Sequence, residues 1–142
     1  MKRRSFIRIG MAGAATGIIA PAGVLASSVG QKISNNNMAG GVYYTKESPG
    51  RWSKKAGAHS PVMEKTDAGI HVVTGHPMNK GEHWIVKHVL LDNDFNFISE
   101  NIFDPGKDKA PISDFRLSGQ VGVVYALSVC NLHDSWLTML EL

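Results

Sequence analysis

The chain has 142 residues, the length of a single domain, and its formal net charge is +3. Four of its 15 Lys and Arg residues lie in the first eight positions, and all 12 Asp and Glu residues lie beyond residue 26. After residue 26 the chain therefore carries 11 basic and 12 acidic residues, a net charge of −1. A nearly neutral body without a basic stripe and interleaved aromatic side chains excludes nucleic acid as a partner.

Residues 1–26 have the pattern of an export signal. A basic start is followed by an apolar run rich in Gly and Ala from Ile9 to Leu25, and Ala26 supplies a small residue for cleavage. The sequence RRSFIR at residues 3–8 resembles the twin-arginine signal. We therefore expect a periplasmic or otherwise exported protein. The alternatives are an ordinary secretory signal or an uncleaved anchor, but the run is short and Gly-rich for a membrane-spanning helix.

Residues 27–41 are rich in Ser, Asn and Gly and have little to bury, which predicts a flexible tether. Residues 42–142 then form one folded domain, large enough for a single core. Within it, an Asp-Ala-Gly turn between 61–65 and 70–74 predicts a hairpin. Further strands are expected at 42–45, 84–91, 95–103, 113–117, 121–129 and 136–140. Short strands separated by turns, with no helical period, indicate an all-β antiparallel sandwich.

Cys130 is the single cysteine of a chain that we expect to be exported. An odd cysteine in an oxidising compartment pairs between chains, stays free or binds a metal, and exposed free thiols oxidise there. Metal binding best explains its presence. A Cys-x2-His pattern joins Cys130 to His133 just after the expected strand 121–129, where a tight turn brings thiolate and imidazole to the same side.

Four of the six histidines complete a candidate metal site. His76 and His83 bound one loop, and His59 precedes a Ser-Pro pair. Together with His133 and Cys130 they offer four imidazoles and one thiolate. Structural zinc prefers four ligands, whereas imidazole with thiolate suits iron or copper. Five ligands with one octahedral position open predict a redox iron that binds a small ligand. The other two histidines, His71 and His88, are expected to be satisfied surface or core residues.

Four stretches carry a family resemblance: AHSPV at 58–62, GHPM at 75–78, EHWI at 82–85 and YALSVCNLH at 125–133. Over about residues 50–137 they resemble the superoxide reductases, which comprise the neelaredoxins and the iron domain of desulfoferrodoxin. The resemblance implies an immunoglobulin-like sandwich with one iron per chain. It also implies reduction of superoxide to hydrogen peroxide, with a small redox protein as electron donor. Its ligands would be four equatorial histidines and one axial cysteine: His59, His76, His83, His133 and Cys130.

The chain departs from the family pattern at three places. Gly57 and Ala58 stand where the family has a Glu-Lys pair, of which the Glu closes the sixth iron position in the oxidised state and the Lys attracts the anion. The loop 76–83 is one position longer than usual, and Asp134 replaces a common Gly. Three lysines near the ligands in sequence could supply the missing charge, or could be solvated loop charges: Lys54, Lys55 and Lys80.

Two other functions are consistent with part of this pattern. Cupredoxins are exported β-sandwiches with a Cys-x2-His-x4-Met loop, but Met139 lies one position too far from His133. A copper carrier would also leave His59 and His76 unexplained. The missing Glu-Lys pair instead supports a non-catalytic metal-binding module. For all three functions we expect no membrane contact after signal removal, and a homo-oligomer is left open.

Overall fold

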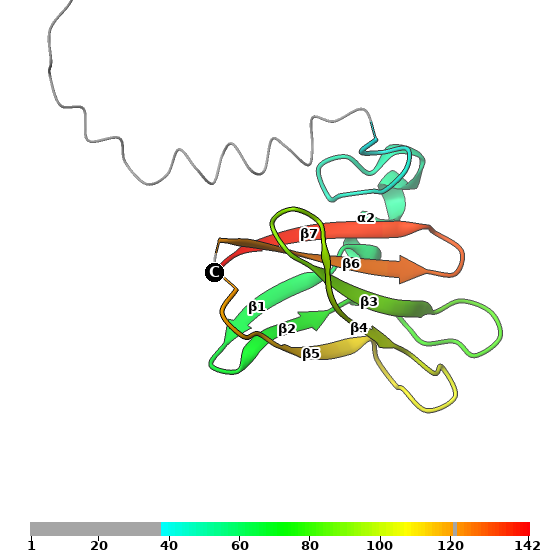
Figure 1. The fold of residues 1–142 in the computed structure, drawn as a ribbon. Helices are drawn as coiled ribbons and strands as arrows, with labels where there is room; N and C mark the ends of the chain where they lie inside the picture. Colours follow the sequence, from blue (N-terminus) through cyan, green and yellow to red (C-terminus); the bar gives the residue numbers. More distant parts are fainter. Residues whose placement is uncertain (1–37, 121) are drawn as a thin grey trace, which may run out of the picture.

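The computed structural model describes residues 38–120 and 122–142. Within these ranges seven strands form two antiparallel sheets that lie face to face (Figure 1). One sheet has the strand order β1-β2-β5 and the other the order β4-β3-β6-β7. The strands are β1 (Val62–Thr66), β2 (Gly69–Val73), β3 (Ile85–Leu91), β4 (Phe97–Ile102), β5 (Ile112–Arg116), β6 (Val123–Cys130) and β7 (Ser135–Glu141). The predicted immunoglobulin-like β-sandwich is confirmed, while the expected export signal lies outside the described residues.

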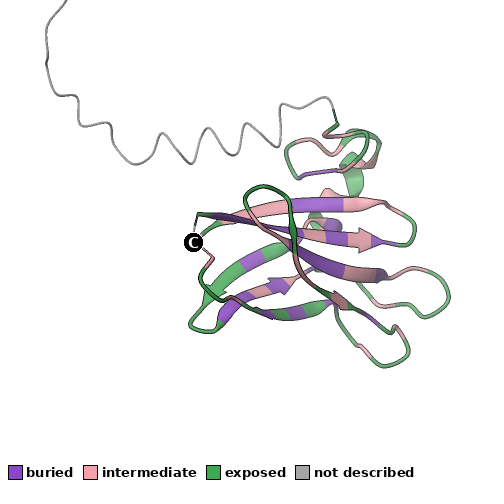
Figure 2. Cartoon of the chain, viewed as in Figure 1, coloured by how far each residue is buried: buried purple, intermediate pink, exposed green. Residues whose placement is uncertain are grey.

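The main core lies between the two sheets. Successive side chains of a strand point to opposite faces, and buried and exposed positions alternate clearly along β5 (Figure 2). Ile70, Val72 and Phe115 from the three-stranded sheet pack in one cluster with Leu90 and Val124 from the four-stranded sheet. Burial of apolar surface contributes about 25 cal/mol per Å², so this contact holds the sheets together.

The central strand of the larger sheet, β6, ends at the candidate metal ligand Cys130. It pairs with β3 on one side and β7 on the other, and most of its residues are buried. Cys130 pairs with Ile85 at the start of β3, next to a register irregularity between Ile85 and Lys87. The thiol is therefore fixed at the end of the best-covered strand of the fold.

The residues before β1 extend the larger sheet and then turn into a short helical stretch. Tyr44 donates its N–H to the Ser135 carbonyl at 2.9 Å and accepts from the Leu137 N–H at 2.8 Å, so the strand expected at 42–45 is reduced to one bridge beside β7. Residues 38–41, within the predicted tether, form a turn closed by the Val42 N–H on the Met38 carbonyl at 2.8 Å.

We expected no helix, and this was wrong for residues 50–59. A 3-10 helix, η1 (Gly50–Lys55), continues into one α-helical turn, α2 (Ala56–His59). Ten residues with a single buried side chain, His59, show no apolar period that a sequence pattern could reveal. In the part of the chain that the model describes, no helix has the length and apolar character needed to span a bilayer.

A buried polar network crosses the sandwich through His88, which is fully buried. Its Nε2 atom lies 2.8 Å from the Thr74 hydroxyl and its Nδ1 atom 2.9 Å from the Ser113 hydroxyl. Thr74 in turn donates to the Ser128 hydroxyl at 2.9 Å. Buried polar groups are costly unless they are hydrogen-bonded, and these partners satisfy both ring nitrogens. The expectation that His88 is a satisfied core residue is confirmed.

Candidate metal centre

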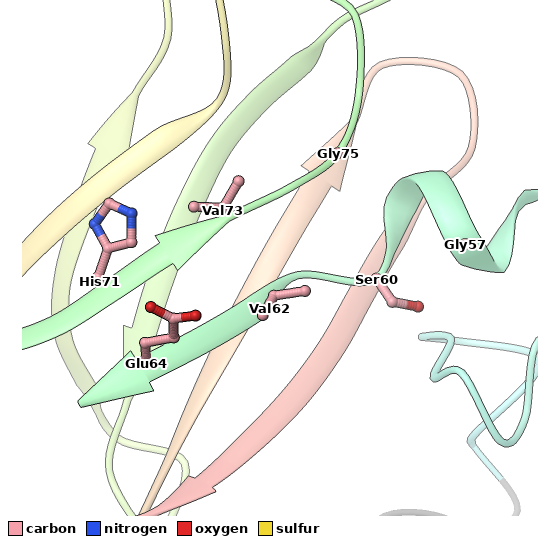
Figure 3. A pocket seen from close by; sticks show the side chains of 7 residues that line it. All are labelled: Gly57, Ser60, Val62, Glu64, His71, Val73 and Gly75. Atoms are coloured by element: carbon pink, nitrogen blue, oxygen red, sulfur yellow. The ribbon is translucent and has the colours of Figure 1, made fainter.

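An open depression of about 380 Å³ lies on the outer face of the three-stranded sheet (Figure 3). Val62, Glu64, His71 and Val73 line it together with residues of the adjoining loops. His71 Nδ1 is 2.7 Å from the Asp114 carboxylate, so this histidine is a satisfied surface residue, as expected. None of the five predicted ligands lines the depression, and the candidate centre is elsewhere.

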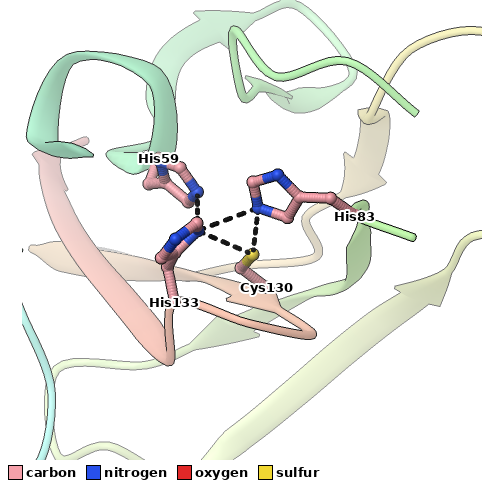
Figure 4. Close-up of side chains that lie close together, drawn as sticks. All are labelled: His59, His83, Cys130 and His133. Atoms are coloured by element: carbon pink, nitrogen blue, oxygen red, sulfur yellow. Dashed lines mark hydrogen bonds between the residues drawn. The ribbon is translucent and has the colours of Figure 1, made fainter. Parts of the chain in front are cut away.

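The five predicted ligands come from five separate parts of the chain and meet at one end of the sandwich. His59 ends α2, His76 follows β2, and His83 precedes β3. Cys130 ends β6, and His133 lies in the turn before β7. The ligand atoms of four of them lie within 4.8 Å of one another (Figure 4), and His76 joins the group through its contact with His83.

The four imidazoles are arranged in a closed ring. His59 Nε2 lies 3.0 Å from His133 Nδ1, which lies 2.8 Å from His83 Nε2, which lies 3.0 Å from His76 Nε2. The ring closes between His76 and His59, whose ring centroids are 4.5 Å apart. Two nitrogen ligands at right angles, each about 2.1 Å from a metal, would be about 3.0 Å apart. The spacing therefore fits four nitrogens around one ion.

The orientations of the imidazoles agree with this order. Neighbouring rings in the sequence His59–His133–His83–His76 are close to perpendicular, with interplanar angles of 86°, 72° and 83°, and the closing pair makes 70°. The opposite pair, His59 and His83, is closer to parallel at 27° and is more widely spaced, at 5.6 Å between centroids. Such alternation is expected when each ring directs one nitrogen to a common centre.

Cys130 supplies the fifth donor. Its Sγ atom lies 3.1 Å from His83 Nε2 and 3.7 Å from His133 Nδ1. The backbone N–H of Leu132 also approaches the sulfur, at 3.5 Å. A sulfur about 2.3 Å from a metal would lie about 3.1 Å from a nitrogen ligand at right angles to it. A thiolate is therefore available beside the imidazole ring, within reach of the same ion.

Backbone carbonyls fix the tautomers of two ligands. His59 Nδ1 donates to the Lys55 carbonyl at 2.9 Å, and His76 Nδ1 donates to the Pro77 carbonyl at 2.5 Å. In both rings the second nitrogen, Nε2, is therefore left unprotonated and faces the other ligands. Metal-bound histidines commonly donate their outer N–H in this way, so the contacts prepare the site for a cation.

The imidazoles are held neutral. Burial is the main cause that lowers the pKa of His59 to about 4, and it also lowers the pKa values of His76, His83 and His133. Neighbouring imidazoles lower several of these pKa values further, because two protonated rings would repel each other. Near neutral pH the site therefore offers lone pairs to a metal and has little affinity for protons.

Two contacts at the site involve residues to which the sequence gave us no reason to assign a role. The Asn131 side chain donates to the Glu82 carbonyl and accepts from the Trp84 N–H, both at 2.9 Å, and so brackets His83 on both sides. Asp134 accepts hydrogen bonds from Arg51 and Trp52. Asn131 stands inside the Cys-Asn-x-His motif, which could have drawn attention to it; Asp134 was noted only as a departure from the family.

The three candidate lysines are exposed but differ in their surroundings. Burial is the largest cause of the lowered pKa values of His76, His83 and His133, and the positive charge of Lys55 lowers all three further. Lys80 instead stands beside Gly106 and contributes to the lowered pKa of Asp104, for which the Gly106 N–H is the main cause. The steering role of all three lysines stays a prediction.

The fold and the donor set define the class: a small β-sandwich in which four imidazoles and one thiolate converge at one end. The chain matches the family model of desulfoferrodoxin over residues 51–139. The protein therefore belongs to the desulfoferrodoxin family, and the resemblance found in the sequence is confirmed. A comparison with curated protein sequences found no match.

Three solved structures are similar to the chain. A superoxide reductase (neelaredoxin) from Ignicoccus hospitalis has 29% sequence identity and a TM-score of 0.59, with 72% of this chain and 95% of that chain covered. A single-site variant of the same protein has 31% identity and a TM-score of 0.61, with 72% and 94% covered. A superoxide reductase from Giardia intestinalis, at 24% identity, TM-score 0.52, and 60% and 98% coverage, supports the fold alone.

Proposed function

We propose that the protein is a superoxide reductase with one iron per chain, held by four histidines and one cysteine: His59, His76, His83, His133 and Cys130. The observation that carries this proposal is the closed ring of four imidazoles with the Cys130 sulfur 3.1 Å from one of them. Membership of the desulfoferrodoxin family and the similarity to the Ignicoccus hospitalis superoxide reductase support the same activity.

Superoxide would take one electron from ferrous iron and two protons from solvent to leave as hydrogen peroxide, and a small redox protein would return the electron. The chain's own groups prepare this chemistry. The Cys130 thiolate would add electron density to a bound iron, as thiolates do in haem enzymes. The four neutral imidazoles would supply the other protein ligands, and the backbone hydrogen bonds of His59 and His76 would hold those two rings in direction.

We also propose Lys55 as the residue that attracts the anion. The chain after residue 26 has a net charge of −1, so its overall charge gives superoxide no attraction. Any attraction must be local, and Lys55 is the candidate lysine whose charge acts on three of the four imidazoles. A basic rim raises the encounter rate of an anion by about tenfold or more.

Export through the twin-arginine route is a further part of the proposal, and the RRSFIR sequence at residues 3–8 supports it. That route carries folded proteins, so iron could be loaded before export. Replacing Arg3 and Arg4 by Lys should leave the protein in the cytoplasmic fraction of cells that export the native chain. Equal export of both chains would contradict this part alone.

The copper alternative is less consistent with the structure. A cupredoxin site would use Met139 after the Cys-x2-His loop, but Met139 packs with Val123, Tyr125 and Leu137 in a separate apolar cluster.

Three measurements on the purified full chain test the proposal together: metal analysis, the ferric absorption spectrum, and the rate with superoxide generated by pulse radiolysis. One iron per chain and rapid formation of hydrogen peroxide are expected. Copper alone, or iron without reaction, would contradict it.

A further inference from the structure

The segment that carries His59 belongs to neither sheet. Residues 50–59 form η1 and α2, and His59 is their only buried residue. Upstream, Tyr44 joins the segment to β7 by two backbone hydrogen bonds. Between Tyr44 and His59, two side chains reach back to the turn that bears His133, and both reach the same residue.

That residue is Asp134, which directly follows His133. Its Oδ2 atom accepts a hydrogen bond from Arg51 Nη2 at 2.6 Å and another from Trp52 Nε1 at 2.7 Å. The Arg51 guanidinium carbon also lies 4.9 Å from the centre of a Trp52 ring. One carboxylate therefore ties down two consecutive residues of η1, more than 80 positions away in the chain.

The same contacts reach the metal ligands. The Trp52 ring meets the His133 imidazole edge-on, with 4.6 Å between centroids and an angle of 83°. The Asp134 carbonyl accepts the Cys130 N–H at 2.9 Å, which closes the turn between the two ligands. Asp134 thus touches the Cys130–His133 turn through its backbone and the His59 segment through its side chain.

We propose that Asp134 is a positioning residue, which assembles the His59–His133 half of the metal centre by locking residues 50–59 onto the Cys130–His133 turn. This inference rests on the metal site proposed above, and it is independent of what the metal reduces. The carboxylate stands at a position where the family pattern commonly has Gly, a residue that could not make these side-chain contacts.

Because of the backbone conformation at Asp134, the direction in which Asp134→Gly changes the attachment of residues 50–59 tests the proposal. Its φ is 61°, in the left-handed region that Gly and Asn adopt more readily than other residues. Asp134→Gly relieves that conformation and removes the carboxylate, whereas Asp134→Asn keeps the shape and removes the charge. If the carboxylate did nothing, the Gly variant would hold the segment as well as the native chain does, or better.

The first measurement is limited trypsin digestion of the metal-free full chain. Lys54 and Lys55 are exposed cleavage sites within the segment, and cleavage there reports how often it opens. We expect Asp134→Gly to raise the rate of this cleavage about three- to tenfold, because it removes a partly exposed charge pair and its hydrogen bonds. Asp134→Asn should raise the cleavage rate less. The matched control is Asp114→Asn, which removes an exposed carboxylate paired with His71. Cleavage of Asp134→Gly at or below the native rate would overturn the proposal.

The second measurement separates positioning from simple anchoring. Cobalt(II) is titrated into the native chain and the variants, and the thiolate and d–d absorption bands report ligand geometry. Asp134→Gly should shift the bands and weaken cobalt binding about tenfold, as removal of outer-shell partners does, while Asp114→Asn should match the native chain. If Asp134→Gly is cleaved faster but keeps the native cobalt bands and cobalt affinity, Asp134 only attaches the segment, and the positioning role is overturned. A native chain that takes up no cobalt would overturn the metal site itself.

Discussion

His59 Nε2 and His133 Nδ1 lie 3.0 Å apart although 74 positions separate the two residues in the chain. The contact joins the last residue of α2 to the turn before β7, and it turns one nitrogen of each ring toward the other candidate ligands. His59→Ala should therefore weaken iron or cobalt binding by at least about 100-fold. His71→Ala is the matched control, since His71 contacts Asp114 within the three-stranded sheet and is not one of the candidate ligands. Equal metal content in both variants would refute the ligand assignment.

Cys130→Ser should leave the sandwich folded, because serine has nearly the same shape and the residue sits at a strand end. The sulfur-to-iron charge-transfer band of the ferric protein should disappear, and the rate with superoxide should fall by at least about 100-fold. Absorption spectroscopy and pulse radiolysis measure both. A variant with unchanged colour would show that Cys130 is not a ligand.

Lys55→Ala should lower the second-order rate with superoxide about two- to tenfold and should weaken its dependence on salt. Exposed charges are screened within about 8 Å at physiological ionic strength, so the native and variant rates should converge at high salt. Lys80→Ala is the control, because Lys80 lies beside Gly106 and Asp104. If Lys80→Ala had the larger effect, the steering role would belong to the 76–83 loop instead.

Gly57→Glu should return a carboxylate to the position where the family pattern has one. Gly57 is exposed, and a Cβ atom there would have no neighbour within 4 Å, so a side chain fits without repacking. A carboxylate that competes for the ferric iron should lower the affinity for azide about tenfold. Azide titration followed by absorption measures this, with Gly75→Ala as a control for backbone effects. Unchanged azide affinity would mean that residue 57 does not reach the metal.

The stability of the metal-free protein should fall as the pH is lowered. Burial lowers the pKa of His88 from 6.5 to about 4, so below pH 6.5 the unfolded chain takes up a proton that the folded chain refuses. The resulting loss of stability grows as the pH falls from about 6.5 to about 4 and amounts to up to about 3 kcal/mol. Urea unfolding at several pH values measures it.

His88→Gln keeps hydrogen-bonding capacity toward Thr74 and Ser113 without a titratable ring. Its stability should depend less on pH over the same window, although its stability at pH 7 should be lower because the shape differs. The same pH slope in both proteins would assign the effect to the ligand histidines, whose pKa values are also lowered.

Most of the strands, and the two loops that carry four of the five candidate ligands, could be predicted from the sequence because each leaves a local pattern. Alternating apolar runs mark the strands, and the Cys-x2-His and His-x6-His spacings mark the ligand loops. The helical stretch 50–59 could not be predicted, because it buries one side chain and so shows no period of apolar residues. The link from Asp134 to Arg51 and Trp52 was equally hidden, because it depends on two segments that only the folded chain brings together.

Proximity in sequence does not by itself place the three candidate lysines. Lys80 lies between two of the predicted ligands in the chain, His76 and His83, and is one of the three lysines considered as a source of the missing charge. The loop 76–83 instead folds back on itself, with the Asn79 and His83 backbones bonded in both directions at 3.0 and 3.1 Å. This pairing places Lys80 at the tip of a tight turn, beside Gly106 rather than the imidazoles.

The contact between residues 59 and 133 also bears on the stability of the folded domain. A metal bound to both histidines would close a loop of 74 residues and so reduce the freedom of the unfolded chain, as a cross-link does. For a disulfide that closes a loop of this length the effect is about 4 kcal/mol. With one cysteine the chain can form no internal disulfide. A bound metal would therefore constrain the unfolded chain as a disulfide does, and chelation should lower the melting temperature of the protein markedly.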